Sequence, residues 1–185
     1  MSLTIEIGTD IISALVEGSS IMSVTATIVV GADGCTSLDG SSTQVTSDAD
    51  RQNFLKRRRM VDCIIIGGNT ARNEPYVRTP VPLVVISRQP HPNLPAAHVW
   101  NVDPCDGVIR AAKEFGENIL IEGGASFISY LLDKNVIDSL ELSLTPASGG
   151  ADIFDFAKYL ARADSLDEKN VDGTIFYTAH FKKLQ

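Results

Sequence analysis

The stretch DCIIIGGNTARNEP, residues 62–75, decides the fold class of this sequence. Four apolar residues, 63–66, lead without a polar break into Gly67-Gly68-Asn69-Thr70. An apolar run of this length, rich in β-branched residues and closed by glycines, predicts a buried strand that ends in a tight loop. Loops at the carboxyl ends of buried strands are where open α/β sheets hold ligands. This loop therefore either holds a phosphate-bearing ligand or only turns the chain.

A second strand end has the same pattern. The segment LIEGGAS, residues 120–126, is again an apolar strand followed by Gly-Gly and then a hydroxyl side chain. Glycine lets backbone N–H groups approach an anion closely, and a following helix presents its positive end. A carboxylate is close to each pair, Glu74 to the first and Glu122 to the second. The matched pairs predict a ligand site at one sheet edge, although a single Gly-Gly pair is also typical of a simple turn. Neither loop has the P-loop or dinucleotide fingerprint.

Composition bounds the kind of protein. A chain of 185 residues with 44% hydrophobic and 21% charged residues is typical of one globular domain. No apolar run approaches the roughly 20 residues of a membrane span, and residues 1–22 lack a signal-peptide pattern. The net charge of −7 argues against a nucleic-acid or anionic-membrane partner. Three widely spaced cysteines, without a C-x-x-C motif or a nearby His pair, disfavour disulfides and zinc. We expect a cytoplasmic protein that binds a small molecule and no metal.

Strands and helices are expected to alternate along the chain. Apolar periodicity predicts strands at 24–30, 63–66, 83–86, 97–102, 118–121, 137–144 and 174–181, and helices at 9–16, 48–60, 106–115 and 126–134. Ser47 is a good N-cap for the second of these helices, with Asp48 and Asp50 in its first turn. The turn-rich segment 31–47 is too long for a simple connection, so we expect it to bind a ligand. The pattern indicates one α/β domain.

The basic cluster Lys56-Arg57-Arg58-Arg59 lies at the end of that helix. At about 100° per residue, Arg58 falls on the side that carries Phe54, Leu55 and Val61, whereas the other three basic side chains point elsewhere and read as a solvated face. An inward guanidinium needs an anionic partner. That partner is either a ligand phosphate or a buried carboxylate.

Five motifs now stand in a recognisable order. They are VGADG at 30–34, GSS at 40–42, TS at 46–47 before a helix with an inward Arg, GGNTARNEP at 67–75 and EGGA at 122–125. This order resembles the riboflavin-biosynthesis reductase family, the reductase domain of the bifunctional deaminase/reductase, over about residues 23–181. The resemblance implies a dihydrofolate-reductase-like fold, a three-layer α/β/α arrangement around a mixed, mostly parallel sheet. Residues 23–185 would form a single reductase domain, after an extension at 1–22 with a short helix. The deaminase zinc motif is missing, which implies a stand-alone reductase.

The resemblance also implies a reaction. Family members reduce 5-amino-6-(5-phosphoribosylamino)uracil with NADPH, by hydride transfer to C1′ of the ring-opened ribose. The resemblance assigns NADPH contacts to Gly67, Thr70, Ser87, Gly123, Gly124, Ala125 and Ser126. It assigns the substrate to Ser42, Arg58 and Glu122, with Arg58 a candidate for the phosphate, and catalytic carboxylates to Asp33 and Glu74. Without the resemblance, Asp33 reads as a turn residue and Glu74 as a surface charge. The family further implies a homodimer, which an exposed apolar strand near 137–144 would fit.

Departures from the family pattern lie mainly in the substrate half. The usual Ser-Leu-Asp-Gly after the first strand is Gly-Ala-Asp-Gly here, and the usual tetrapeptide occurs instead at 37–40. We assign the functional carboxylate to Asp33, directly after the strand, and not to Asp39. Gln44 stands where the family often has Trp. Two alternatives therefore stay open: a reductase of the same fold for another pterin, pyrimidine or folate-like substrate, and a non-catalytic nucleotide-binding protein.

Overall fold

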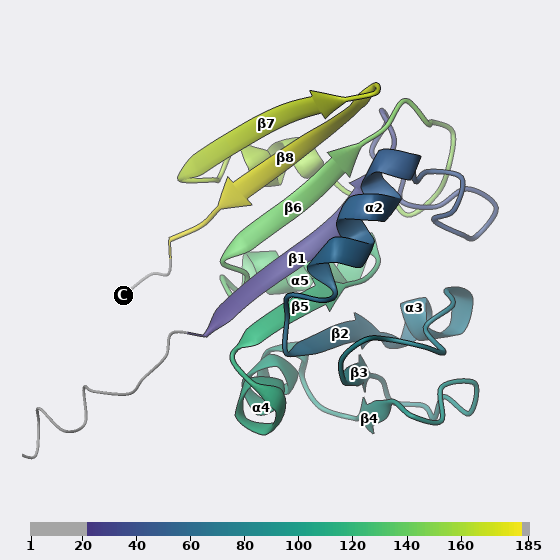
Figure 1. The fold of residues 1–185 in the computed structure, drawn as a ribbon, viewed down its shortest axis with the longest axis vertical. Coiled ribbons are helices and arrows are strands. Elements are labelled where there is room, and N and C mark those ends of the chain that lie inside the picture. The colour runs from purple at the N-terminus through teal and green to yellow at the C-terminus, as the bar shows by residue number, and fades with distance from the viewer. Residues whose placement is uncertain (1–21, 183–185) are drawn as a thin grey trace, which may run out of the picture.

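The strands form one eight-stranded sheet in a computed structural model that describes residues 22–182 (Figure 1). Their order is β4-β3-β2-β5-β1-β6-β8-β7. The strands are β1 Ser23–Val30, β2 Cys63–Gly67, β3 Leu83–Ile86, β4 His98–Trp100, β5 Asn118–Glu122, β6 Ser139–Leu144, β7 Ser165–Val171 and β8 Thr174–His180. In this order each strand from β4 through β3, β2, β5 and β1 to β6 pairs in parallel with its neighbour. Strand β8 pairs antiparallel with β6 and β7. The sheet is therefore mixed and mostly parallel, as expected.

Helices cover both faces of the sheet. They are α2 Asp48–Arg57, α3 Gly68–Asn73, α4 Pro104–Phe115, α5 Ala125–Asp133 and α6 Phe156–Leu160. On one face Ile65 packs in a large buried cluster with Val108 of α4 and Ile128 of α5. On the other face Ile64 packs with Ala71 of α3 in a smaller cluster. A strand buried on both faces reads as a continuous apolar run, which is why 63–66 shows no alternation. The three-layer prediction is confirmed.

Helix α2 crosses in front of β1 in Figure 1, and it contacts polar side chains of the sheet. Arg57 donates hydrogen bonds to Thr27 Oγ1 of β1 at 3.2 Å and to Glu141 Oε2 of β6 at 3.0 Å. Its side chain is only 19% exposed. The expectation that Arg57 belongs to a solvated face is therefore wrong, because the sheet beneath the helix offers it a carboxylate and a hydroxyl.

Several predicted boundaries differ from the structure. Helix α2 ends at Arg57 and not at residue 60, because Arg59 and Met60 donate to carbonyls three residues earlier and tighten the chain into a turn. The strand expected at 97–102 shortens to His98–Trp100, and α4 begins at Pro104 because the Asp103 side chain caps it. Strand β6 is interior, between β1 and β8, and its Leu140 and Leu142 are buried. The idea of an exposed apolar strand near 137–144 is therefore wrong.

Three elements were not predicted: α3, α6 and β7. Strand β7 is a charged edge strand, SLDEKNV, without apolar alternation. The Asp172-Gly173 turn that joins it to β8 has positive φ at both residues, and an Asp-Gly pair of this kind is a hairpin signal. The helix expected at 9–16 lies outside the described residues. Within residues 22–182, no helix has the length and apolar character that crossing a membrane requires.

Candidate functional site

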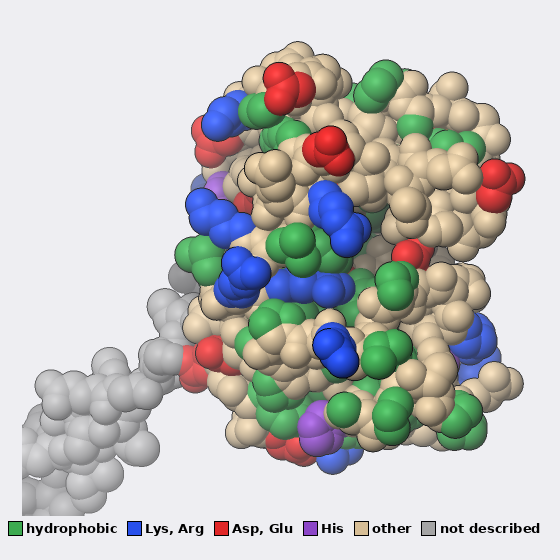
Figure 2. Space-filling model, turned by 45° about the vertical axis from the view of Figure 1, so that its right-hand side comes forward, with side chains coloured by type: hydrophobic (Ala, Val, Ile, Leu, Met, Phe, Trp, Pro, Cys, Tyr) green, Lys and Arg blue, Asp and Glu red, His purple; other side chains and the backbone are tan. Residues whose placement is uncertain are grey.

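A cavity of about 400 Å³ lies at the carboxyl ends of β1 and β5, between α2, the segment after α3 and the loop 31–47. Its volume suits a small-molecule site. Figure 2 shows a hollow on this face with Lys and Arg side chains gathered beside it. Seven predicted site residues line the cavity: Ser42, Arg58, Thr70, Glu74, Glu122, Gly123 and Gly124. The structure thus brings together residues from four separate motifs.

A buried ion pair closes one side of the cavity. Arg58 Nη2 and Nε donate to the Glu122 carboxylate at 2.6 and 2.9 Å, and Tyr76 Oη donates to Glu122 Oε2 at 2.8 Å. The Arg58 guanidinium lies between the rings of Phe54 and Tyr76, 4.1 and 4.7 Å from their centroids. Of the two partners that the sequence left open for Arg58, the structure contains the buried carboxylate.

The ionisation of this cluster follows from its burial. Burial lowers the pKa of Arg58, but the hydrogen bonds and charge of Glu122 outweigh burial, so the net shift is upward. Burial, and then the charge of Glu122, raises the pKa of Tyr76 well above its ordinary value. Tyr76 therefore keeps its proton and donates at neutral pH. The hydrogen bonds of Arg58 to Glu122 use Nε and Nη2, so the two N–H groups of Nη1 do not take part in the ion pair.

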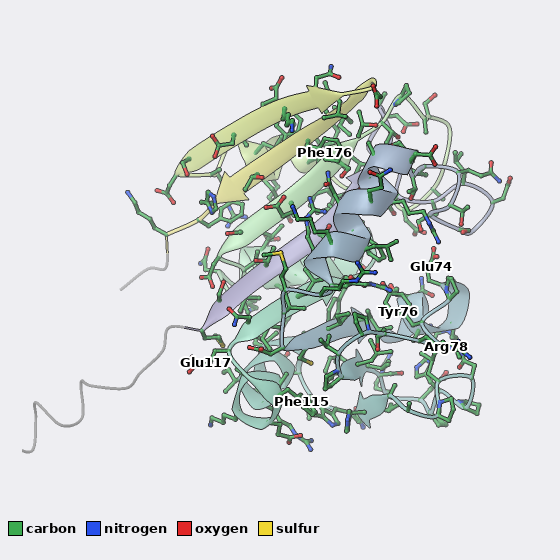
Figure 3. The ribbon with its side chains drawn as sticks, viewed as in Figure 1. Glu74, Tyr76, Arg78, Phe115, Glu117 and Phe176 are labelled. Atoms are coloured by element: carbon green, nitrogen blue, oxygen red, sulfur yellow. The ribbon has the colours of Figure 1, made fainter. Side chains whose placement is uncertain are left out.

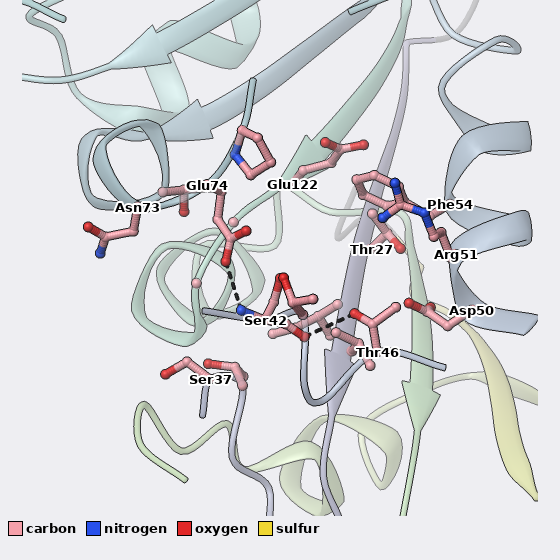
Figure 4. Close-up of a pocket in the computed structure, with 18 of the residues that line it drawn as sticks. Thr27, Ser37, Ser42, Thr46, Asp50, Arg51, Phe54, Asn73, Glu74 and Glu122 are labelled. Atoms are coloured by element: carbon pink, nitrogen blue, oxygen red, sulfur yellow. Dashed lines mark hydrogen bonds between the residues drawn. The ribbon is translucent and has the colours of Figure 1, made fainter. Parts of the chain in front are cut away.

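Glu74 ties two parts of the cavity together. Its Oε1 accepts a hydrogen bond of 2.8 Å from the backbone N–H of Ser42, in the loop 31–47 (Figure 4). Figure 3 shows Glu74 and Tyr76 on the side of their segment that faces α2. Two residues predicted from separate motifs are therefore in direct contact, and the long loop lines the cavity, as expected of a binding loop.

The two glycine pairs lie next to each other. A Cβ atom at Gly67 or at Gly123 would lie 3.4 Å from the ring of Phe127. Helix α5 begins directly after Gly124, which has no side-chain cap, and a Cβ atom at Gly124 would meet nothing within 4 Å. The first N–H groups of a helix have no intrahelical partner, and within residues 22–182 those of Ala125 and Ser126 donate to no other backbone carbonyl. This arrangement fits an anion.

Ser87 lies outside this cavity, in a second and more open hollow of about 490 Å³. Its Oγ shares a hydrogen bond of 2.9 Å with Nε2 of His91, which is buried. A Cβ atom at Gly68 would lie 2.7 Å from Ser87 Oγ, so the hydroxyl packs against the first residue of α3. Arg88 lines the same hollow.

Asp33 lies outside the lining of both hollows. Its carboxylate accepts hydrogen bonds from the N–H groups of Gly149 at 2.6 Å and Cys35 at 3.1 Å. These two bonds, that of Gly149 first, lower the pKa of Asp33 to about 2. The geometry is that of a turn residue, the alternative given above, and the catalytic role of Asp33 stays a prediction.

Several lining residues were not predicted, among them Thr27, Asp50, Arg51, Phe54, Asn73 and Tyr76. Asp50 was read only as a charge in the first turn of a helix, yet it is 6% exposed. Asp50, Phe54 and Arg58 are spaced four residues apart, and residues so spaced share one helix face. This spacing could have predicted that Asp50 lies on the inward side of the helix with Arg58.

Comparison with known proteins gives one family. Residues 22–157 match the family described as the RibD C-terminal domain. No curated protein matches the chain. The chain belongs to a fold shared with RibD from Acinetobacter baumannii: the two are 18% identical with a TM-score of 0.65, over 88% of this chain and 59% of that one.

Two further solved structures are similar. A deaminase/5-amino-6-(5-phosphoribosylamino)uracil reductase from Thermotoga maritima is 16% identical with a TM-score of 0.64, over 88% of this chain and 57% of that one. A pyrimidine reductase-like protein from Corynebacterium diphtheriae is 16% identical with a TM-score of 0.66, over 91% and 98%. The chain therefore spans less than two thirds of the length of the proteins from Acinetobacter baumannii and Thermotoga maritima. Because the family match covers more than half of the sequence, the chain belongs to the RibD C-terminal domain family.

Proposed function

We propose that this protein is an NADPH-dependent reductase of a phosphoribosylaminopyrimidine, of the kind that acts on 5-amino-6-(5-phosphoribosylamino)uracil. The family is one of pyrimidine reductases that generally use NAD(P)H. One observation supports the proposal most directly. The two glycine pairs lie next to each other and to the uncapped start of α5, at the edge of a cavity with polar walls.

The residues present fit the cofactor. The N–H groups at the start of α5, with Gly124 open before them, suit the pyrophosphate, and Thr70 and Gly123 line the adjoining wall. Ser87 and Arg88, in the second hollow, supply a hydroxyl and a guanidinium for the phosphate that distinguishes NADPH from NADH. When bound, NADPH supplies the hydride.

The chain's own groups position the substrate and move a proton. Reduction of the ring-opened imine adds a hydride to C1′ and a proton to the adjacent nitrogen. Glu74 is the proposed proton donor because its carboxylate lines the cavity. Arg58 Nη1 and Ser42 are proposed to hold the phosphoribosyl part, while Glu122 and Tyr76 keep the guanidinium in place. Asp33 stays a predicted catalytic residue.

The loss of NADPH absorbance tests the reaction, with the phosphoribosylaminouracil, with dihydrofolate and with neither. Turnover of the first supports the proposal, and turnover of dihydrofolate alone supports a related reductase of the same fold. Tight binding of NADPH without turnover of any pterin or pyrimidine supports a non-catalytic protein. The predicted homodimer is tested by light scattering.

The choice between NADPH and NADH is tested separately. Arg88→Gln is expected to weaken NADPH binding by about tenfold or more, the worth of one charge-assisted hydrogen bond, and to leave NADH binding unchanged. Arg78→Gln is the matched control, because Arg78 is exposed and lies outside the lining of both hollows. Equal losses for the two cofactors would remove Arg88 from the site.

A further inference from the structure

A buried histidine packs beside the serine of the second hollow. His91 is 5% exposed, and its Nε2 shares a hydrogen bond of 2.9 Å with Ser87 Oγ. Both atoms lie against the first glycine pair, because a Cβ atom at Gly68 would be 2.7 Å from Ser87 Oγ and 3.4 Å from His91 Nε2. Ser87 itself is only partly buried and lines the hollow together with the exposed Arg88. His91 is therefore placed to act on a ligand in this hollow through Ser87.

The neighbouring chain holds the imidazole in place. The backbone N–H of Leu94 donates to the His91 carbonyl at 2.9 Å, and Leu94 is buried in the smaller core cluster. Asn93 Nδ2 donates to the carbonyl of Ala71 in α3, also at 2.9 Å. Of the residues that line the hollow, Arg88 and His91 are the ones with a charged or titratable side chain. The His91 ring is thus anchored on both sides in sequence and in contact with one hydroxyl.

The hydrogen-bonding capacity of Ser87 makes the state of His91 important. A serine hydroxyl has one hydrogen to donate and two lone pairs. One lone pair accepts the backbone N–H of Gln89 at 3.1 Å. If His91 Nε2 carries a hydrogen, it donates to the second lone pair, and the hydroxyl hydrogen is free to point into the hollow. If Nε2 carries none, the hydroxyl donates to the imidazole, and a lone pair faces the hollow instead. Phosphate oxygens are acceptors, so they match only the first arrangement.

We propose that His91 is a positioning residue that makes Ser87 a hydrogen-bond donor and so sets the preference for NADPH over NADH. The Nε2–H of His91 donates to Ser87 Oγ, and the Ser87 hydroxyl donates to the phosphate that distinguishes NADPH. NADH has a hydroxyl in place of this phosphate. A hydroxyl can donate as well as accept, so it matches either arrangement of Ser87. This inference rests on the proposed function for the cofactor, and it adds the residue that orients Ser87.

Binding of the two cofactors to variants of His91 tests the inference without turnover. His91→Leu removes the donor to Ser87 and should weaken NADPH binding by about fivefold, the worth of one neutral hydrogen bond, at unchanged NADH affinity. His91→Gln keeps an N–H donor and should keep the wild-type preference. In a Ser87→Ala background, His91→Leu should not change the preference further, because the hydroxyl through which it acts is gone. His98→Leu is the matched control, because His98 is exposed and lies outside the lining of both hollows.

The wild-type protein offers a second measurement, the hydrogen on the imidazole itself. In the NADPH complex of protein labelled with ¹⁵N-histidine, His91 Nε2 should show the NMR shift of a ring nitrogen that carries a hydrogen. The chain has three histidines, and the signal that disappears in His91→Gln identifies the ring. A hydrogen-free Nε2 in that complex would overturn the inference.

The outcomes separate this inference from the proposed function. Equal losses of NADPH and NADH affinity in His91→Leu, or a loss of preference that recurs in the Ser87→Ala background, would reduce His91 to a structural residue. A wild-type protein that binds both cofactors equally would overturn the inference, while the reductase reaction would still be decided by NADPH oxidation with the phosphoribosylaminouracil. A preference that depends on His91, together with no NADPH oxidation, would support the inference and reject the reaction.

Discussion

Removing one partner of the buried Arg58–Glu122 pair should destabilise the protein strongly. In Arg58→Met the Glu122 side chain, 2% exposed, would keep only the Tyr76 hydroxyl as a hydrogen-bond donor among the groups that now contact it. An uncompensated buried charge costs about 3–5 kcal/mol. At roughly 2–4 °C per kcal/mol for a chain of this size, we expect the melting temperature to fall by roughly 6–20 °C.

A double-mutant cycle separates the pair from its surroundings. Urea unfolding is measured for the wild type, Arg58→Met, Glu122→Gln and the double variant. The double variant leaves neither charge unpaired, so its loss should be smaller than the sum of the single losses, with a coupling of about 1–3 kcal/mol. Glu114→Gln is the matched control, because its partner Arg110 is exposed and such pairs contribute about 0.3–0.5 kcal/mol. Additive losses, or an Arg58→Met loss as small as that of Glu114→Gln, would refute this account of the cluster.

Three further changes probe the other contacts. Tyr76→Phe removes a donor to a buried carboxylate and should lower the free energy of unfolding by about 1.5–3 kcal/mol in urea titrations; an unchanged midpoint would mean that another donor replaces the hydroxyl. Gly124→Ala should weaken NADPH binding at an unchanged melting temperature, because its Cβ atom would occupy the open space before α5 without touching the protein; unchanged affinity in fluorescence titrations would place the cofactor elsewhere. Asp33 has a lowered pKa of about 2 against an ordinary 3.8, so its stabilising effect is present above 3.8 and is lost as the pH falls through 2. The melting temperature of Asp33→Asn should therefore lie below that of the wild type at neutral pH and converge with it in acid; a gap independent of pH would contradict this. The kcat/KM of the same variant, set beside that of Asp39→Asn, tests the predicted catalytic role.

The fold was predictable where apolar runs are continuous. The apolar runs at 63–66 and at 119–121 are buried on both faces, so composition alone marks them as central strands. Strand β7 escaped because an edge strand needs no apolar face, and its exposed charged side chains carry no periodic signal. Helix α3 was not predicted because its first residue, Gly68, belongs to the Gly-Gly pair, which is typical of a loop.

The site was predictable only in part, for a different reason. The glycine pairs, Glu74 and Arg58 belong to local motifs, whereas the contacts of Arg58 with Glu122 and Tyr76 join segments far apart in the sequence. Asp50 has the sequence context of an ordinary first-turn acid, and its burial depends on the sheet that α2 covers. A helical wheel extended by one turn from Phe54 would have placed Asp50 on the same face.

The polar contacts between α2 and the sheet affect how readily this helix opens locally. Asp50 is the buried residue of this helix, and the bonds of Arg57 to Thr27 and Glu141 join it to the sheet. Lifting such a helix exposes little apolar surface, and water can replace the hydrogen bonds that are lost. Local opening should therefore cost much less than global unfolding, so amide hydrogens in α2 should exchange well before those in β1 and β5. Because residues of α2 and Glu74 line the same cavity, a ligand that contacts both would join this helix to the opposite wall and should slow the exchange of its amide hydrogens.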